Sequence, residues 1–125
     1  MKKVITTKNA PAAIGPYSQA IEVNGMIFIS GQLPIDPKSG KFPDGGVKEQ
    51  TLQAFKNIKA ILAEEGLTTD NIVKTTVLLA DMSLFAEMNE VYASQFNGLF
   101  PARSAFAVKA LPKDALVEIE VIASR

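Results

Sequence analysis

The residue with the clearest chemical potential lies near the C-terminal end of the chain. Arg103 and Arg125 are the only arginines among thirteen basic residues, and Arg125 is the last residue. Arg103 follows a proline by two positions and precedes the strand-like stretch Ser-Ala-Phe-Ala-Val. A guanidinium differs from a lysine ammonium because its planar donors bind both oxygens of a carboxylate. A single interior guanidinium at the start of an apolar strand therefore raises the question of what it binds.

Two carboxylates follow in the stretch LVEIEVIA, residues 116–123. The two-residue period of a strand puts Glu118 and Glu120 on one face, about 6.6 Å apart, and the apolar residues on the other. If this strand is the antiparallel neighbour of the strand that follows Arg103, a glutamate lies near the guanidinium. Two alternatives without a catalytic role stay open. The glutamates could lie on a solvated outer face, or one of them could form a purely structural ion pair with Arg103.

Two further short stretches contain candidate binding residues. In SGQ, residues 30–32, the glycine would let a ligand approach the backbone, and the amide of Gly31 can donate to an anion. In GPY, residues 15–17, Tyr17 stands at the boundary between a loop and a strand. The alternatives are a β-bulge at Gly31 and an ordinary core aromatic at Tyr17.

The composition narrows the chemistry that these residues can perform. The chain has no cysteine and no histidine, which excludes disulfides, zinc–thiolate sites and a histidine general base. Thirteen acidic residues balance thirteen basic ones, so there is no overall electrostatic footprint for nucleic acid or an anionic membrane. Any catalysis must therefore use carboxylates, lysine, hydroxyls, arginine, backbone groups or water.

The length and the apolar runs indicate one compact domain. A chain of 125 residues is long enough for a single core, and we assign residues 1–125 to one domain. The first residues lack the apolar core of a signal peptide, and no apolar run approaches the roughly 20 residues of a membrane span. We expect a cytoplasmic protein with no membrane partner.

The elements that would position these residues follow a β-β-β-α-β-α-β-β order. An Asn-Gly pair between two apolar runs predicts a tight hairpin over residues 19–30. The remaining pattern predicts strands at 4–7, 72–80, 104–109 and 116–123, helices at 47–65 and 81–96, and loops at 9–17 and 34–46. We expect Gly66 to end the first helix and Asp81 or Ser83 to cap the second. Together these elements predict an α+β domain built on one sheet.

The strands MIFIS and TVLLA are apolar on both of their alternating faces. Two helices can cover only one face of a sheet of five or six strands, so the second apolar face needs another cover. Self-association is the simplest source of this cover. The alternative is that the long loops fold over the second face.

Four stretches taken together resemble the RidA/YjgF family of enamine/imine deaminases over nearly the whole chain. They are NAPAAIGPYSQAI, FISGQLPIDPKSG, NIVKTTVLLADMSLFAEMNEVY and FPARSAFAVKALPKDALVEIEVIA. The resemblance implies a chorismate-mutase-like α+β fold, with a mixed sheet of about six strands and two helices packed on one face. It also implies a homotrimer with clefts between neighbouring subunits.

The resemblance implies a reaction as well, and this reaction requires no metal or cofactor. Members hydrolyse 2-iminobutanoate and 2-iminopropanoate, or their enamine tautomers such as 2-aminoacrylate, to 2-keto acids and ammonia, and so remove reactive by-products of pyridoxal-phosphate enzymes. By position, Arg103 would bind the substrate carboxylate and Glu118 would hold or activate water. Tyr17, Ser30 and Gly31 would line the pocket, with Asn89 approaching from a neighbouring helix. Many relatives have cysteine two residues after the arginine, where this chain has Ala105.

Other functions in the same family remain alternatives. Members have been described as endoribonucleases or translation inhibitors, and a non-catalytic keto-acid-binding or chaperone-like protein would use the same cleft. Neutral net charge and the absence of histidine weigh against a nuclease and against a nucleic-acid partner.

Overall fold

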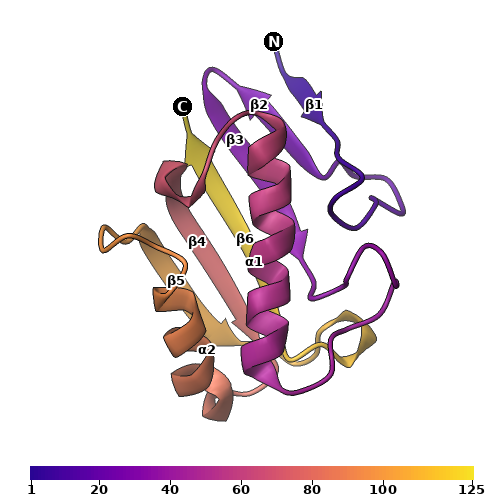
Figure 1. The fold of residues 1–125 in the computed structure, drawn as a ribbon, viewed down its shortest axis with the longest axis vertical. Helices are drawn as coiled ribbons and strands as arrows, with labels where there is room; N and C mark the ends of the chain where they lie inside the picture. The colour runs from indigo at the N-terminus through magenta and orange to yellow at the C-terminus, as the bar shows by residue number, and fades with distance from the viewer.

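The computed structural model describes residues 1–125, which form one six-stranded sheet with two α-helices on one of its faces (Figure 1). The strands are β1 (Lys3–Ile5), β2 (Ala20–Val23), β3 (Met26–Gln32), β4 (Ile72–Leu79), β5 (Ala102–Ala107) and β6 (Val117–Ser124). The helices are α1 (Val47–Glu64) and α2 (Phe85–Ala93), with 3₁₀ turns at Thr69–Asn71, Met82–Leu84 and Pro112–Asp114. No helix is long and apolar enough to cross a membrane. The expected element order is confirmed.

The strand order is β1-β2-β3-β6-β4-β5, and only the β4–β5 pair is parallel. A parallel pair needs a crossover, and α2 supplies it between β4 and β5. This crossover carries β5 to the edge of the sheet, while β6 pairs with both β3 and β4. The condition under which a glutamate would lie near the guanidinium, that β5 and β6 are antiparallel neighbours, is therefore not met, because β4 lies between them.

Helix α1 packs its apolar stripe against the sheet. Phe55, Ile58 and Leu62 are fully buried, whereas Leu52, which has the same sequence spacing, is 41% exposed. Gly66 ends the helix as expected, with φ +71° and its N–H donating to the carbonyl of Ala63. The N–H of Leu67 donates to the carbonyl of Leu62 and closes the same turn. The positive φ that this turn requires at position 66 favours glycine.

The region around α2 differs in its boundaries from the expected 81–96 helix. Asp81 caps a 3₁₀ turn instead, its carboxylate accepting from the N–H of Ser83, and the α-helix begins only at Phe85. Strand β5 begins at Ala102, two residues before the expected start, because it pairs with β4 from that point. Arg103 consequently lies inside a strand, with its side-chain direction set by the sheet.

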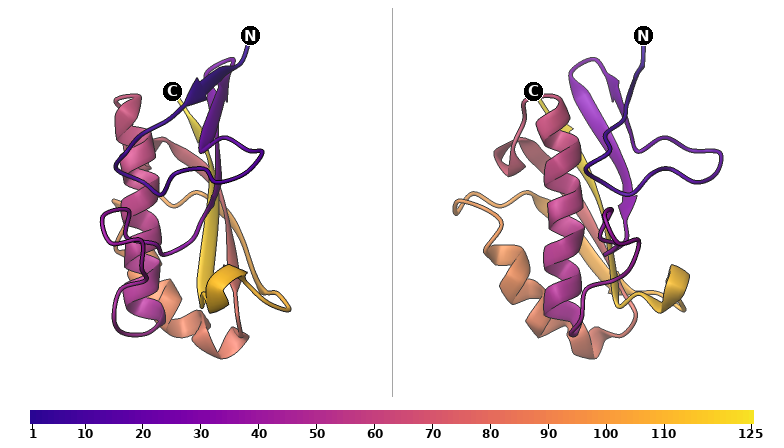
Figure 2. Two further views of the ribbon diagram at one scale, coloured as in Figure 1. Left: turned by 90° about the vertical axis from the view of Figure 1, so that its right-hand side faces the viewer. Right: turned by 45° about the vertical axis from the view of Figure 1, so that its right-hand side comes forward.

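The second face of the sheet has no helix over it, as Figure 2 shows most clearly in its left view. The apolar side chains on this face are only partly covered, with Val4 at 59%, Phe28 at 44% and Phe106 at 47% exposed. The expected second apolar face is therefore confirmed. The alternative that the long loops of the same chain cover it is wrong.

The loops beside the sheet are held by buried amides. Asn57 on α1 is 1% exposed, and its amide nitrogen donates to the carbonyls of Leu33 and Ile35. Gln19 makes a similar set of bonds to residues 7–11, donating to the carbonyls of Thr7 and Pro11. These bonds satisfy loop carbonyls that neither helix nor sheet can reach.

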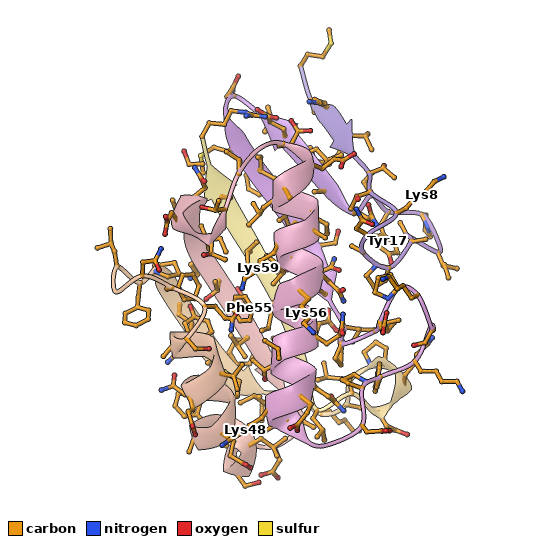
Figure 3. All side chains as sticks on the ribbon, in the orientation of Figure 1. Lys8, Tyr17, Lys48, Phe55, Lys56 and Lys59 are labelled. Carbon is orange, nitrogen blue, oxygen red and sulfur yellow. The ribbon has the colours of Figure 1, made fainter.

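We predict that Asn57→Leu destabilises the protein by about 2 to 4 kcal/mol, because it removes donors from two loop carbonyls without opening a large cavity. Urea denaturation followed by circular dichroism measures this change. The neighbouring Lys56 is exposed on the same helix (Figure 3), so Lys56→Ala is the control and should shift stability by less than about 0.5 kcal/mol. Equal stability of Asn57→Leu and the parent protein would contradict the anchoring role.

Candidate active site

The guanidinium of Arg103 lies between β5 and α2 and makes no ion pair with a carboxylate. Its Nη1 donates to Oδ1 of Asn89 at 2.6 Å. Its Cζ lies 4.7 Å from the ring centroid of Tyr92 and 5.3 Å from that of Phe85. Aromatic faces attract a cation without neutralising it, so the remaining donors of Arg103 stay free to bind an anion. The ion pairs of the chain do not include Arg103.

A cavity of about 420 Å³ opens beside this guanidinium. Asn89 and Arg103 supply its polar groups, and the rest of its wall is formed by Tyr92, Ala93, Phe100 and Pro101. Phe100 packs edge-on against Phe96, with ring centroids 6.0 Å apart, and continues the aromatic cluster of Phe55 and Tyr92. The geometry suits a small carboxylate that carries an apolar group.

The aromatic surroundings of Arg103 are not predicted from the sequence. Phe85, Asn89 and Tyr92 have the i, i+4, i+7 spacing of one helix face, so an asparagine interrupts an otherwise aromatic stripe. That polar interruption was the signal available in the sequence. Phe100 and Pro101 had no comparable signal, because their approach to Arg103 depends on the path of a loop.

A second group of the expected residues gathers around the start of β6. The carboxylate of Glu118 lies against Gly31, where a methyl group placed on the glycine would meet Oε2. Tyr17 and Gly31 line one cavity of about 160 Å³, together with Ile14, Gln32, Leu33 and Lys113 among others. Tyr17 is 54% exposed, so the alternative that it is a core aromatic is wrong.

Ser30 connects the strand to the loop that carries Tyr17. Its Oγ donates to the carbonyl of Ser18 at 2.7 Å, and its backbone N–H donates to the carbonyl of Gln19. Ser30 therefore fixes the Tyr17 loop beside Gly31. No hydrogen bond joins this group to Arg103, and Figure 3 places Tyr17 on the far side of α1 from α2 and β5.

The register of the sheet explains why the two groups are separate. Arg103 pairs with Thr75, which pairs with Val121, and the buried Thr75 and Val121 lie on the face that the helices cover. Glu118 pairs with Leu78 and lies on the opposite face. Side chains at paired positions share a face, so Arg103 and Glu118 of one chain point to opposite sides of the sheet. The structural Arg103–glutamate pair considered from the sequence is absent.

The carboxylate of Glu118 is electrostatically strained in its half-buried position. Burial raises the pKa of Glu118 above its ordinary value of 4.5, and the negative charge of Glu120 raises it further. Burial also raises the pKa of the Tyr92 phenol, although the hydroxyl bond to Thr75 and the charge of Arg103 oppose this. No three acidic side chains gather closely enough to form a metal site.

Comparison with known proteins agrees with the fold and with the sequence motifs. A family model described as Endoribonuclease L-PSP matches residues 7–125. The chain belongs to the RidA/YjgF family. The 2-iminobutanoate/2-iminopropanoate deaminase of Mus musculus is 54% identical over 123 residues, which cover 98% of this chain and 91% of the mouse protein.

Solved structures of this family superpose on the whole fold. The Rid family protein YyfA from Yersinia pestis matches with a TM-score of 0.96 and 52% identity, covering all of both chains. E. coli TdcF, solved with bound serine, matches with a TM-score of 0.94 and 43% identity over 98% of each chain. The expected α+β fold with a mixed six-stranded sheet and two helices on one face is confirmed.

We predict that Glu120→Gln lowers the pKa of Glu118, because it removes a like charge, while burial keeps that pKa above 4.5. Titration of the side-chain carboxyl by ¹³C NMR measures the shift. A carboxyl with a raised folded-state pKa favours folding most fully below its unfolded pKa and loses this contribution as pH rises through the folded value. The stability of the wild type should therefore fall as pH rises from the unfolded to the folded pKa of Glu118. This fall should be smaller in Glu120→Gln.

The control is Glu64→Gln, which removes an exposed charge on α1. It should leave the titration of Glu118 unchanged. A Glu118 pKa that stays the same or rises in Glu120→Gln would contradict the proposed effect of the neighbouring charge.

Proposed function

We propose that this protein hydrolyses 2-imino acids and their enamine tautomers, with 2-iminobutanoate and 2-iminopropanoate as the reference substrates. The observation that carries the proposal is a guanidinium with free donors and no carboxylate partner, set in a cavity with apolar walls. The mouse relative bears the name of this activity, and the TdcF relative was solved with serine, a small α-amino acid. Both support a ligand that combines a carboxylate with an adjacent nitrogen.

The reaction needs little more than position and one carboxylate. Arg103 would bind the substrate carboxylate through two parallel donors and so fix the neighbouring C=N carbon. Water adds to this carbon, the C=N electron pair moves to nitrogen, and the C–N bond then breaks to give a 2-keto acid and ammonia. Glu118 would accept one proton from the attacking water and pass it to the nitrogen, and the remaining O–H proton would move to the nitrogen as the C–N bond breaks and the C=O bond forms. A raised pKa suits a group that must both take and give a proton.

Arg103 and Glu118 of one chain cannot serve one substrate, so the proposal requires a second copy. We propose a homotrimer in which the uncovered sheet face packs against neighbouring subunits. Each cleft would then combine Arg103 and Asn89 from one subunit with Tyr17, Ser30, Gly31 and Glu118 from its neighbour. The exposed Phe28 and Phe106 support this arrangement, because they lie on the face that neither helix covers.

We predict that multi-angle light scattering gives a mass three times the 13.4 kDa of one chain at micromolar concentration. Phe28→Asp should dissociate the assembly, since it places a charge in the apolar contact. Leu52→Asp is the matched control, because Leu52 is similarly exposed but lies on α1. A stable wild-type monomer would remove the shared cleft and this form of the proposal with it.

We predict a division of labour between the two charged residues. Arg103→Lys keeps the charge but loses the planar donors, which should cost about 2 to 4 kcal/mol of transition-state binding, or roughly 30- to 1000-fold in rate. Glu118→Gln should lower turnover while the affinity for 2-ketobutyrate persists or increases, because it removes a repelling negative charge.

Both variants are tested by coupling the protein to a threonine dehydratase and following 2-ketobutyrate release, with calorimetry for binding. Arg125→Lys is the control for the arginine substitution, since Arg125 pairs with Glu22 and Glu65 away from either cavity. It should keep wild-type turnover. Wild-type turnover in both Arg103→Lys and Glu118→Gln would contradict the proposal.

The description of the family model keeps an endoribonuclease as the rival activity. The absence of histidine and the neutral net charge weigh against it for this chain. Incubation with single-stranded RNA gives a direct comparison. RNA cleavage that Arg103→Lys leaves intact would indicate a different site from the one proposed for imine hydrolysis.

A further inference from the structure

Strand β3 contains a β-bulge where it passes the catalytic candidate Glu118. Ile29 pairs with Val121 and Gln32 pairs with Ile119, so Ser30 and Gly31 stand opposite the single residue Glu120. Two residues against one is the definition of a bulge, and such features commonly redirect a side chain or backbone at a site. The alternative that Gly31 belongs to a β-bulge, which the sequence left open, is therefore confirmed.

The carboxylate of Glu118 occupies the space where any other residue at position 31 would carry its side chain. A Cβ atom built on Gly31 would meet Cδ of Glu118 at 2.9 Å and Cγ at 3.3 Å, and would overlap Oε2. The conflict therefore involves the stem of the glutamate as well as its mobile end. A side chain at position 31 would displace the carboxylate from the strand.

The bulge itself is braced and cannot easily move aside. The side-chain amide of Gln32 donates to the carbonyl of Ser30 at 3.0 Å, and Gln32 is 5% exposed. Ser30 is bonded from its other side to Ser18 and Gln19. Because the strand is held at both ends of the bulge, a clash at Gly31 is relieved more readily by moving Glu118 than by moving β3.

The surroundings of Glu118 give it no other anchor in the chain. It takes part in none of the side-chain ion pairs, and the adjacent position on β4 is the apolar Leu78. Glu120, on the same strand, is the one charged group that shifts its titration, and it repels rather than holds the carboxylate. Contact with the bare backbone of Gly31 is what defines the position of Glu118.

We propose that Gly31 is a positioning residue whose missing side chain seats the carboxylate of Glu118. This proposal rests on the proposed function, and it gives Gly31 a role different from that of lining the pocket or donating its amide to a ligand. The seat would keep Glu118 half-buried and aimed along one direction, as a group that handles the proton of a single water requires.

A double-mutant cycle separates these roles. We expect Gly31→Ala to lower kcat at least tenfold, with less than a threefold change in the affinity for 2-ketobutyrate. In a Glu118→Gln background the same change should lower kcat by less than twofold, because the side chain it displaces no longer carries the function. Gly46→Ala is the matched control, since a Cβ there meets nothing within 4 Å and its φ is −111°.

Equal losses in the two backgrounds would overturn the proposal, because Gly31 would then act independently of Glu118. So would a loss of keto-acid affinity as large as the loss in kcat, which would indicate direct contact between Gly31 and the ligand. Retention of native circular dichroism and of the wild-type mass shows that Gly31→Ala is folded.

A second measurement does not depend on catalysis. In Gly31→Ala the displaced carboxylate should become more exposed, so the pKa of Glu118 in a ¹³C NMR titration should fall toward 4.5, and Gly46→Ala should not change it. An unchanged pKa of Glu118 in Gly31→Ala would overturn the proposed positioning role of Gly31. If Gly31→Ala shifts the pKa of Glu118 but the wild-type protein has no imine hydrolase activity, the positioning role of Gly31 is supported and the proposed function is overturned.

Discussion

The alternation of side chains across the sheet governs how this protein can assemble a site. Arg103 shares the helix-covered face with Thr75 and Val121, and Glu118 shares the opposite face with Leu78. Helix α2 then supplies Asn89 and two aromatic rings to the arginine, while neither α1 nor α2 covers the glutamate's face. One chain thus contains two separate halves of a cleft, and the uncovered face is also the surface through which a second copy would join them.

The two arginines show how differently one side-chain type is used. Arg125 donates to both oxygens of Glu22 at 2.7 and 3.0 Å and also binds Glu65, so its charge is matched within the chain. Arg103 rests on two aromatic faces and one amide oxygen, which orient the guanidinium without neutralising it. Glu118 is similarly unmatched, because burial and Glu120 disfavour its charge. Unmatched charges held in defined positions are costly for folding and useful for binding and catalysis.

The sequence predicts the fold more completely than it predicts the geometry of the site. Asn24-Gly25, with φ of 50° and 77°, makes the expected hairpin turn, and Gly66 ends α1 as expected. Errors concentrate where non-local pairing decides, as in the early start of β5 and the separation of β5 from β6. The resemblance names Asn89, which does bind Arg103, but the sequence does not predict the Phe85 ring beside the guanidinium or the Phe100 wall of the cavity.

The sequence by itself determined the order of the elements, the two-sided apolar character of the sheet, the family and the residue types available for chemistry. These follow from local periodicity, turn residues, composition and motifs, which are written in neighbouring positions of the chain. Only the tertiary structure decided that β6 lies between β3 and β4, that Arg103 and Glu118 point to opposite faces, and that Glu118 lies on Gly31. The physical reason is that strand order and bulge position depend on pairing between distant segments and on the parallel crossover through α2, which local sequence patterns do not encode.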